Sequence, residues 1–279
     1  MYLRCLLLAF TCSQVAPDSP ATIDQMVVIG ASASAGWGVV LPGHPTEENP
    51  VQHHHVHLAD TLAPAMGIKP DQIKTYATGM FFSNPFEIGT AQITAAQKAD
   101  PDLLIGLDFL FWYAYGTHDD AGLQHGDPDV DSRLKMVELG LSELDRLSTP
   151  MLIGDVPDVS SAADVWPVAM ISASQIPSPS ALASINNRIH AWAETRDHVT
   201  LIPLAQATQK IQNGEPLKTG DTTWTSADRL LQFDQLHPTS DGLIALTMLT
   251  VDLIPQADRL KNTAKNIRTH CVPTPHTTP

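Results

Sequence analysis

Cysteine is scarce in this sequence, which contains only Cys5, Cys12 and Cys271. The first 13 residues resemble a short export signal, with Arg4 as its positive end and an apolar stretch over residues 5–10. The alternative is that the start residue of the protein is wrongly assigned and that these residues form a frayed N-terminus. Removal of the signal would leave Cys271 as the single clear cysteine, so no internal disulfide framework is expected. We therefore expect an exported protein, periplasmic or extracellular.

Basic residues and long apolar runs are also few. Lys and Arg number 16 against 30 Asp and Glu, which gives a formal net charge of -14. This charge repels phosphate backbones and anionic lipid surfaces, so we expect no nucleic-acid partner. No apolar run approaches the ~18 residues that span a bilayer, and no integral membrane segment is expected. A composition of 43% hydrophobic and 16% charged residues is typical of a globular protein.

Short apolar, β-rich runs alternate with segments of helical periodicity. The runs cover residues 26–29, 74–77, 103–107, 151–154 and 199–202. Helical spacing of apolar residues is clearest over residues 134–144 and 182–192. Because parallel strands need crossover connections, the pattern predicts an α/β protein: a three-layer α/β/α sandwich with a mainly parallel five-stranded sheet, flavodoxin-like in kind.

The chain shows no internal repeat and no linker, so one domain is expected over residues 23–262. A leader at residues 1–22 would precede it, and a loose Pro/Thr-rich tail at residues 263–279 would follow. Residues 160–179 are rich in Ser, Ala and Pro, which predicts a long loop. Such a loop either covers a site or is merely mobile.

A stretch of small residues, Gly-Ala-Ser-Ala-Ser-Ala-Gly, occupies positions 30–36 directly after the first strand. In open α/β sheets, ligands bind at the carboxyl ends of the strands. Small neighbours would let Ser32 project into a cleft, and N–H groups of the turn could face a developing oxyanion. Alone, such a turn is more often plain turn chemistry or a phosphate cradle.

A second feature, Asp-Gln-Leu-His-Pro at positions 234–238, lies near the end of the expected fold. Pro238 suits the first turn of a helix, which puts Asp234 and His237 in the loop before it. The Asp234 carboxylate can then fix the imidazole tautomer and stabilise the imidazolium formed when His237 takes a proton from a Ser hydroxyl. Alone, this pattern favours a helix cap with a surface histidine.

Together the two features resemble the two ends of the SGNH, or GDSL-type, hydrolase family, and the resemblance extends over residues 26–254. It implies a serine hydrolase of esterase or lipase type that passes through an acyl-Ser32 intermediate, with Asp234 and His237 completing the triad. It implies no cofactor and no metal, and a small-molecule, lipid or carbohydrate ester as substrate. Ala31 stands where the family usually has Asp.

The resemblance also implies an oxyanion hole made by the Ser32 N–H, a Gly after the second strand and an Asn after the third. Gly79 matches the Gly, whereas Asp108 occupies the place of the Asn. An ionised carboxylate cannot donate a hydrogen bond and would oppose an oxyanion. Loss of one donor costs roughly a hundredfold to a thousandfold in turnover, so two donors can still work. On this basis, Asp108→Asn should raise turnover.

Two alternatives to ester hydrolysis use the same residues. Acyl transfer to an alcohol or sugar needs the same triad. A non-catalytic homologue that binds a ligand in the same cleft is the other, because Ala31 and Asp108 depart from the family pattern.

Two further motifs have bland and functional interpretations. The aromatic run at residues 109–115 would line the cleft mouth or simply pack in the core. His53 and His57 lie one helical turn apart, but no further ligand completes a metal shell. A solvated helix face is therefore expected for this histidine segment.

Overall fold

The computed structural model describes residues 23–42, 53–116, 130–165, 171–254 and 267. The leader predicted at residues 1–22 and all but one residue of the predicted tail lie outside this part of the chain. No helix within the described ranges is long and apolar enough to span a membrane.

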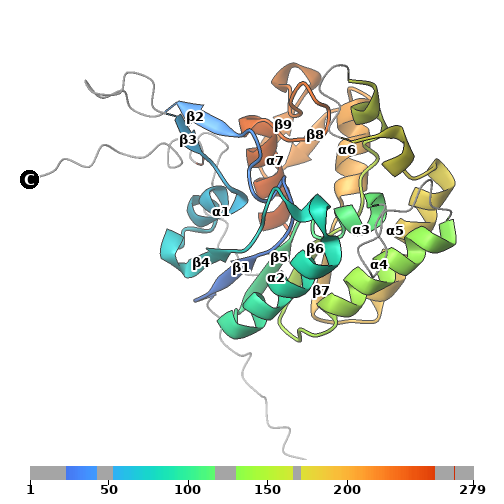
Figure 1. Ribbon diagram of the computed structural model, residues 1–279. Coiled ribbons are helices and arrows are strands. Elements are labelled where there is room, and N and C mark those ends of the chain that lie inside the picture. The colour runs from blue at the N-terminus through green and yellow to red at the C-terminus, as the bar shows by residue number, and fades with distance from the viewer. Residues whose placement is uncertain (1–22, 43–52, 117–129, 166–170, 255–266, 268–279) are drawn as a thin grey trace, which may run out of the picture.

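A five-stranded parallel sheet forms the centre of the molecule (Figure 1). Its strands, in spatial order, are β4 (Ile73–Thr75), β1 (Met26–Val28), β5 (Leu103–Gly106), β6 (Met151–Gly154) and β7 (Val199–Ile202). Every neighbouring pair is parallel. The predicted strands are confirmed to within one or two residues, and this order is the flavodoxin-like one.

Helices cover both faces of the sheet, which confirms the three-layer α/β/α fold. One layer contains α2 (Pro85–Ala99), α4 (Val130–Leu144) and α5 (Pro179–Glu194), and α2 and α4 lie in front of the strands in Figure 1. The other contains α1 (Leu58–Met66), α6 (Leu204–Gln212) and α7 (Ser240–Val251). Successive side chains of β1 point to opposite faces of the sheet. Val27 therefore packs in the core under α2, whereas Met26 and Val28 pack in the core under α1.

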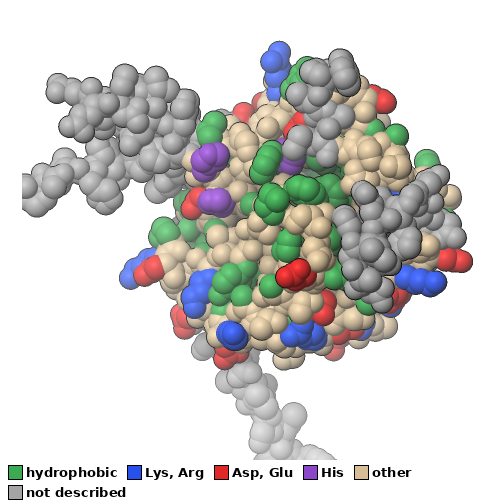
Figure 2. All heavy atoms as spheres, in the orientation of Figure 1, with side chains coloured by type: hydrophobic (Ala, Val, Ile, Leu, Met, Phe, Trp, Pro, Cys, Tyr) green, Lys and Arg blue, Asp and Glu red, His purple; other side chains and the backbone are tan. Residues whose placement is uncertain are grey.

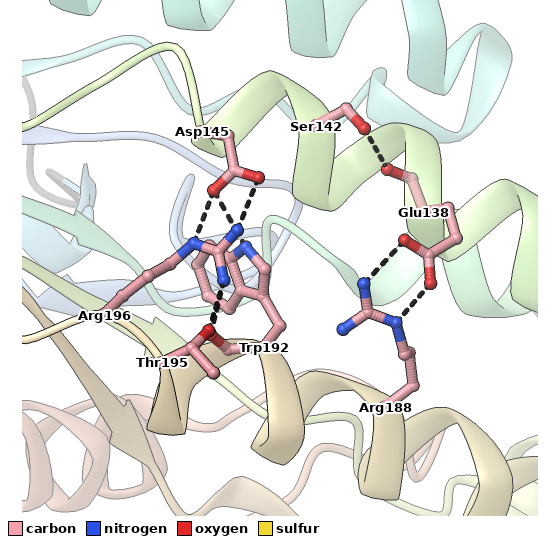
Figure 3. Close-up of polar contacts among 7 residues, drawn as sticks. All are labelled: Glu138, Ser142, Asp145, Arg188, Trp192, Thr195 and Arg196. Atoms are coloured by element: carbon pink, nitrogen blue, oxygen red, sulfur yellow. Dashed lines mark hydrogen bonds and ion pairs between the residues drawn. The ribbon is translucent and has the colours of Figure 1, made fainter.

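Polar contacts join α4 and α5 on the outside of their layer (Figure 3). Arg188 makes a two-pronged ion pair with Glu138. Asp145 accepts hydrogen bonds from the Trp192 indole at 2.9 Å and from Arg196 Nη2 at 2.8 Å. Exposed pairs of this kind contribute roughly 0–1 kcal/mol each to stability.

The remaining elements are short and do not belong to the five-stranded sheet. They are the ribbon β2 (Val40–Pro42) with β3 (His53–His55), the hairpin β8 (Leu217–Thr219) with β9 (Thr222–Trp224), the short helix α3 (Phe111–Tyr115), and the 3-10 turns η1 (Pro70–Gln72), η2 (Phe81–Ser83), η3 (Ser160–Asp164), η4 (Ala173–Gln175) and η5 (Ser226–Asp228). The long segment predicted at residues 160–179 thus contains η3 and η4, and its residues 166–170 lie outside the described ranges.

Two local predictions were wrong. The histidine segment is not a helix face: His53–His55 pairs antiparallel with β2, and α1 begins only at Leu58, where Asp60 accepts the His57 N–H at 2.8 Å. Pairing between strands overrides helical spacing here. Pro238 is not in a first helical turn either, since it bridges to Leu231 and α7 begins after its N-cap, Thr239.

The aromatic run after β5 packs in the core. Phe109, Tyr113 and Tyr115 are fully buried, and the rings of Phe111 and Tyr115 stack at 4.4 Å between centroids. Ordinary packing therefore accounts for most of this run, and Phe111 alone of these aromatics borders the cavity described below.

Candidate active site

The turn after β1 and the turn after β5 meet at the carboxyl edge of the sheet. The chain leaves β1 toward β4 on one side and leaves β5 toward β6 on the other, so a crevice opens between these two strands. Ser32 follows β1 and Asp108 follows β5. The order of the strands thereby brings together residues that are distant in the sequence: Ala31 donates its N–H to Asp108, 77 positions away.

The Asp108 carboxylate holds the turn that carries Ser32. One oxygen accepts the Ala31 N–H at 2.9 Å and the Ser34 hydroxyl at 2.5 Å. The other accepts the Ala33 N–H at 2.8 Å and the Ser34 N–H at 3.3 Å. Among the described residues, no hydrogen bond uses the N–H of Ser32, which is thus the uncommitted donor of this turn.

These contacts make Asp108 an acceptor whose two oxygens are both engaged. Ala31 cannot supply a side chain to this turn, and the Asp108 carboxylate from the neighbouring strand stabilises it instead. Because of these hydrogen bonds, we expect Asp108→Asn to lower turnover instead of raising it.

Gly30 and Gln92 fix the start of the same turn. The Gln92 amide, on the buried face of α2, accepts the Gly30 N–H at 2.8 Å and donates to the Gly30 carbonyl at 2.9 Å. Gly30 has φ +141°, and a Cβ there would lie 2.2 Å from an Asp108 oxygen. The sequence analysis missed Gln92. Its signal was a glutamine at a helical position that lies on the same buried face as Gly89 and Ile93.

Asp234 and His237 form a close pair in the loop before α7. The His237 Nδ1 and an Asp234 oxygen lie 2.6 Å apart, and the other Asp234 oxygen accepts the N–H groups of Leu236 and His237 at 3.0 Å each. Burial alone would raise the pKa of Asp234, but these hydrogen bonds outweigh it and hold the pKa below its ordinary value. With Nδ1 engaged, Nε2 is the ring nitrogen left for chemistry.

Trp37 links the nucleophile turn to the histidine loop. The backbone N–H of Trp37 donates to the Ser32 carbonyl at 2.9 Å, and the backbone carbonyl of Trp37 accepts from the Gln232 side-chain amide at 2.8 Å. Its ring lies 6.1 Å from the His237 ring and packs on Gly79, where a Cβ would come within 2.6 Å of the indole. Sequence reasoning also missed Trp37, which carries no motif signal.

The predicted site residues are thus brought to one edge of the sheet, with one qualification. No hydrogen bond joins Ser32 to His237 among the described residues. The described part of the chain also contains no group of three His, Cys, Asp or Glu residues arranged to hold a metal ion.

An apolar cavity opens beside Ser32. Asp108 and Phe111 also line it, together with residues of α6 and α7. Asp155, after β6, borders it as well, and its carboxylate accepts the Ala205 N–H at 2.7 Å in the first turn of α6. Burial raises the pKa of Asp155, although the hydrogen bonds from Ala205 and His190 oppose that rise.

Neither a family model nor a curated protein sequence matches the chain. Solved structures do. A protein described as a GDSL-like lipase from Parabacteroides merdae superposes with a TM-score of 0.50 at 11% identity, covering 82% of this chain and 95% of its own. The esterase EstA from a Pseudoalteromonas species gives a TM-score of 0.45 at 11% identity, covering 83% and 96%. A protein described as an acylhydrolase from Bacteroides fragilis gives 0.44 at 17% identity, covering 81% and 84%.

At such identities the likeness concerns the fold, and the second and third scores are too low to add to it. The strand order, the helical layers and the superposition on the first of these structures agree. This chain has the fold of the SGNH/GDSL-type hydrolases.

Proposed function

We propose that the protein is a serine hydrolase that cleaves an ester through an acyl-Ser32 intermediate. The observation that carries this proposal is the Asp234–His237 pair, at 2.6 Å, in which His237 is buried and Asp234 is half-buried, on the sheet edge that also presents the Ser32 turn. A carboxylate bound to Nδ1 orients the ring and favours proton uptake at Nε2.

In the proposed reaction, the Ser32 hydroxyl passes its proton to His237 Nε2 while its oxygen attacks the acyl carbon. Asp234 stabilises the imidazolium, which then gives the proton to the departing alcohol oxygen. Water repeats the sequence on the acyl-enzyme and releases the acid. No cofactor enters any step.

The negative oxygen formed during attack needs donors. The uncommitted Ser32 N–H is the first, and the Gly79 N–H, unused by the hydrogen bonds of the described residues, is the second. Asp108 supplies no donor, so the hole has two. We expect a slower enzyme than one with a third donor, by roughly a hundredfold to a thousandfold.

A non-catalytic ligand-binding protein is the second candidate. The missing hydrogen bond between Ser32 and His237, together with the missing third donor, favours it. Catalytic hydrogen bonds are often long in unliganded enzymes, which is why we place hydrolysis first. Acyl transfer uses the same triad and differs only in the acceptor that takes the acyl group.

Labelling with a fluorophosphonate separates a serine enzyme from a non-catalytic binding protein, because the reagent needs an activated hydroxyl. We expect covalent labelling at Ser32 and hydrolysis of 4-nitrophenyl acetate, both lost in Ser32→Ala with little change in Tm. Ser34→Ala is the matched control for the position of the label, because Ser34 is fully buried and its hydroxyl is bound to Asp108. Absence of any label would favour the binding protein. A label on Ser34 would show that the nucleophile is Ser34 and that the assignment to Ser32 is wrong.

We also propose export, supported by the signal-like pattern at the N-terminus. The mass of the N-terminal peptide from the native host's periplasm or medium tests it. An intact Met1 on protein confined to the cytoplasm would contradict export.

A further inference from the structure

The Ser32 turn (residues 30–38) and the His237 loop (residues 229–239) come from opposite ends of the chain. Within the described residues, no hydrogen bond joins the Ser32 and His237 side chains. The rings of Trp37 and His237 lie 6.1 Å apart, and Figure 2 shows histidine side chains next to hydrophobic ones on the surface that it draws. Because apolar contact has no preferred direction, it does not by itself fix the position of the imidazole relative to the serine.

One side chain makes directional contacts to both segments. The Gln232 side-chain nitrogen donates to the Trp37 carbonyl and to the Pro238 carbonyl, at 2.8 Å each. An amide NH₂ group has two donors, and both are used here. The backbone N–H of Gln232 donates to the His237 carbonyl at 2.8 Å. In the part of the chain that the structure describes, the contact with Trp37 is the only hydrogen bond between the Ser32 turn and the His237 loop.

The contact at Trp37 continues to the nucleophile. The Trp37 N–H donates to the Ser32 carbonyl at 2.9 Å. The path from the Ser32 backbone to the His237 backbone therefore runs through the Gln232 amide. Without that amide, each segment would keep its own internal hydrogen bonds, but the two segments could shift relative to each other.

Gly38 leaves the space that the Gln232 amide occupies. A Cβ on Gly38 would lie 2.7 Å from Gln232 Oε1 and 3.1 Å from Gln232 Nε2. These atoms end a flexible side chain, so an alanine at position 38 would push the amide away from the Trp37 carbonyl. Residue 38 therefore offers a way to displace the amide while Gln232 stays in the sequence.

We propose that Gln232 is a positioning residue, whose side-chain amide holds the His237 loop at the distance from Ser32 that proton transfer requires. The inference rests on the proposed function and adds a residue to it. The Gln232 side chain bonds to backbone carbonyls alone, so its loss should slow the chemical step at Ser32 and leave the binding of a reagent unchanged.

The test measures fluorophosphonate labelling of Ser32 at several reagent concentrations, at a temperature where every variant is folded. Gln232→Ala should lower the maximal labelling rate by about tenfold to a hundredfold, as expected for a misplacement of ~1 Å. The reagent concentration that gives half of this rate should not change. Gln97→Ala is the matched control, because the exposed Gln97 amide also donates to a backbone carbonyl, that of Arg146 at 3.0 Å, near the end of α2. It should be labelled at the natural rate.

A pair of glycine variants separates displacement of the amide from backbone strain. Gly38 and Gly214 both have φ +69°, but a Cβ at Gly214 would meet nothing within 4 Å. Gly38→Ala should lower the maximal labelling rate by about tenfold or more, whereas Gly214→Ala should leave it unchanged. In Gln232→Ala protein, adding Gly38→Ala should change the rate by less than about twofold, because no amide is left to displace.

Three results would overturn the positioning role: a natural labelling rate in Gln232→Ala, a change confined to the half-maximal concentration, or an equal loss from Gly38→Ala with and without Gln232. Failure of the natural protein to react with the fluorophosphonate overturns the proposed function instead. Should Gln232→Ala not fold, the glycine pair decides alone. A loss confined to Gly38→Ala supports the role, and equal rates in Gly38→Ala and Gly214→Ala overturn it.

Discussion

Replacing Asp108 by Asn separates two opposite effects of its carboxylate. The carboxylate accepts four hydrogen bonds from the turn that carries Ser32. Its negative charge also opposes the oxyanion that forms beside Ser32 during ester cleavage. Asparagine keeps the size and removes the charge, so the change in turnover reports which effect is larger. We expect the loss of positioning to dominate.

The size of the loss follows from the contacts. In its best orientation, the Asn oxygen keeps the N–H groups of Ala33 and Ser34, and its amide donates to the Ser34 hydroxyl. The Ala31 N–H then faces an NH₂ group and loses its acceptor. A hydrogen bond to a charged group contributes about 1.5–3 kcal/mol, and roughly 2 kcal/mol in a chain of this size lowers Tm by about 4–8 °C. A shift of the nucleophile by ~1 Å can cost ~100-fold in rate.

The assay measures fluorophosphonate labelling and 4-nitrophenyl acetate hydrolysis alongside thermal unfolding. Asp108→Asn should be labelled about tenfold to a hundredfold more slowly than the natural protein. Asp102→Asn is the matched control, because Asp102 also caps backbone N–H groups, those of Asp24 and Gln25, but at the opposite edge of the sheet. It should leave labelling unchanged. Faster labelling of Asp108→Asn would refute the positioning role and make the amide a third oxyanion donor.

Further predictions concern Gly30, Gln92 and Asp234. Gly30→Ala should lower the free energy of unfolding, measured with urea, by about 3 kcal/mol or more, because its Cβ would lie 2.2 Å from an Asp108 oxygen. Gly214→Ala is also at positive φ but has nothing within 4 Å, so it should lower the free energy of unfolding by about 1 kcal/mol. Equal losses in the two variants would contradict the steric argument. Gln92→Leu should cost roughly 2 kcal/mol or more by leaving buried Gly30 groups unpaired, and should slow labelling; unchanged stability would count against it. Because the pKa of Asp234 is lowered from about 3.8, its ionised form stabilises the fold above that pH, and this contribution disappears as pH falls through the lower folded-state pKa. The stability gap between the natural protein and Asp234→Asn should therefore close in acid, as followed by tryptophan fluorescence, and a gap constant to pH ~2 would contradict it.

Much of the fold could be predicted from the sequence because the signals are local. Each strand is an apolar run of a few residues, and α4 and α5 repeat apolar residues at helical spacing. Asp234 and His237 lie in one short loop, so their pairing also follows from neighbours in the chain. The Ser32 turn was recognisable from its small residues and its place after a strand. Whether that serine reacts stays a prediction.

The histidine segment shows where local spacing misleads. His53 and His57 have the separation of one helical turn, yet pairing with β2 makes residues 53–55 a strand. Backbone hydrogen bonds to a partner strand stabilise this extended form, and the spacing of the histidines carries no information about that partner.

Only the tertiary structure decided how the nucleophile turn is held. Sheet order places β5 beside β1, and this alone brings Asp108 under the turn at Ala31 to Ser34. Gln92 reaches Gly30 from 62 positions away, and Gln232 reaches Trp37 across 195. Such contacts depend on which loops share an edge of the sheet. Residue type and local periodicity determine most of the central strands and the helices α4 and α5, whereas strand order and packing determine which side chains meet.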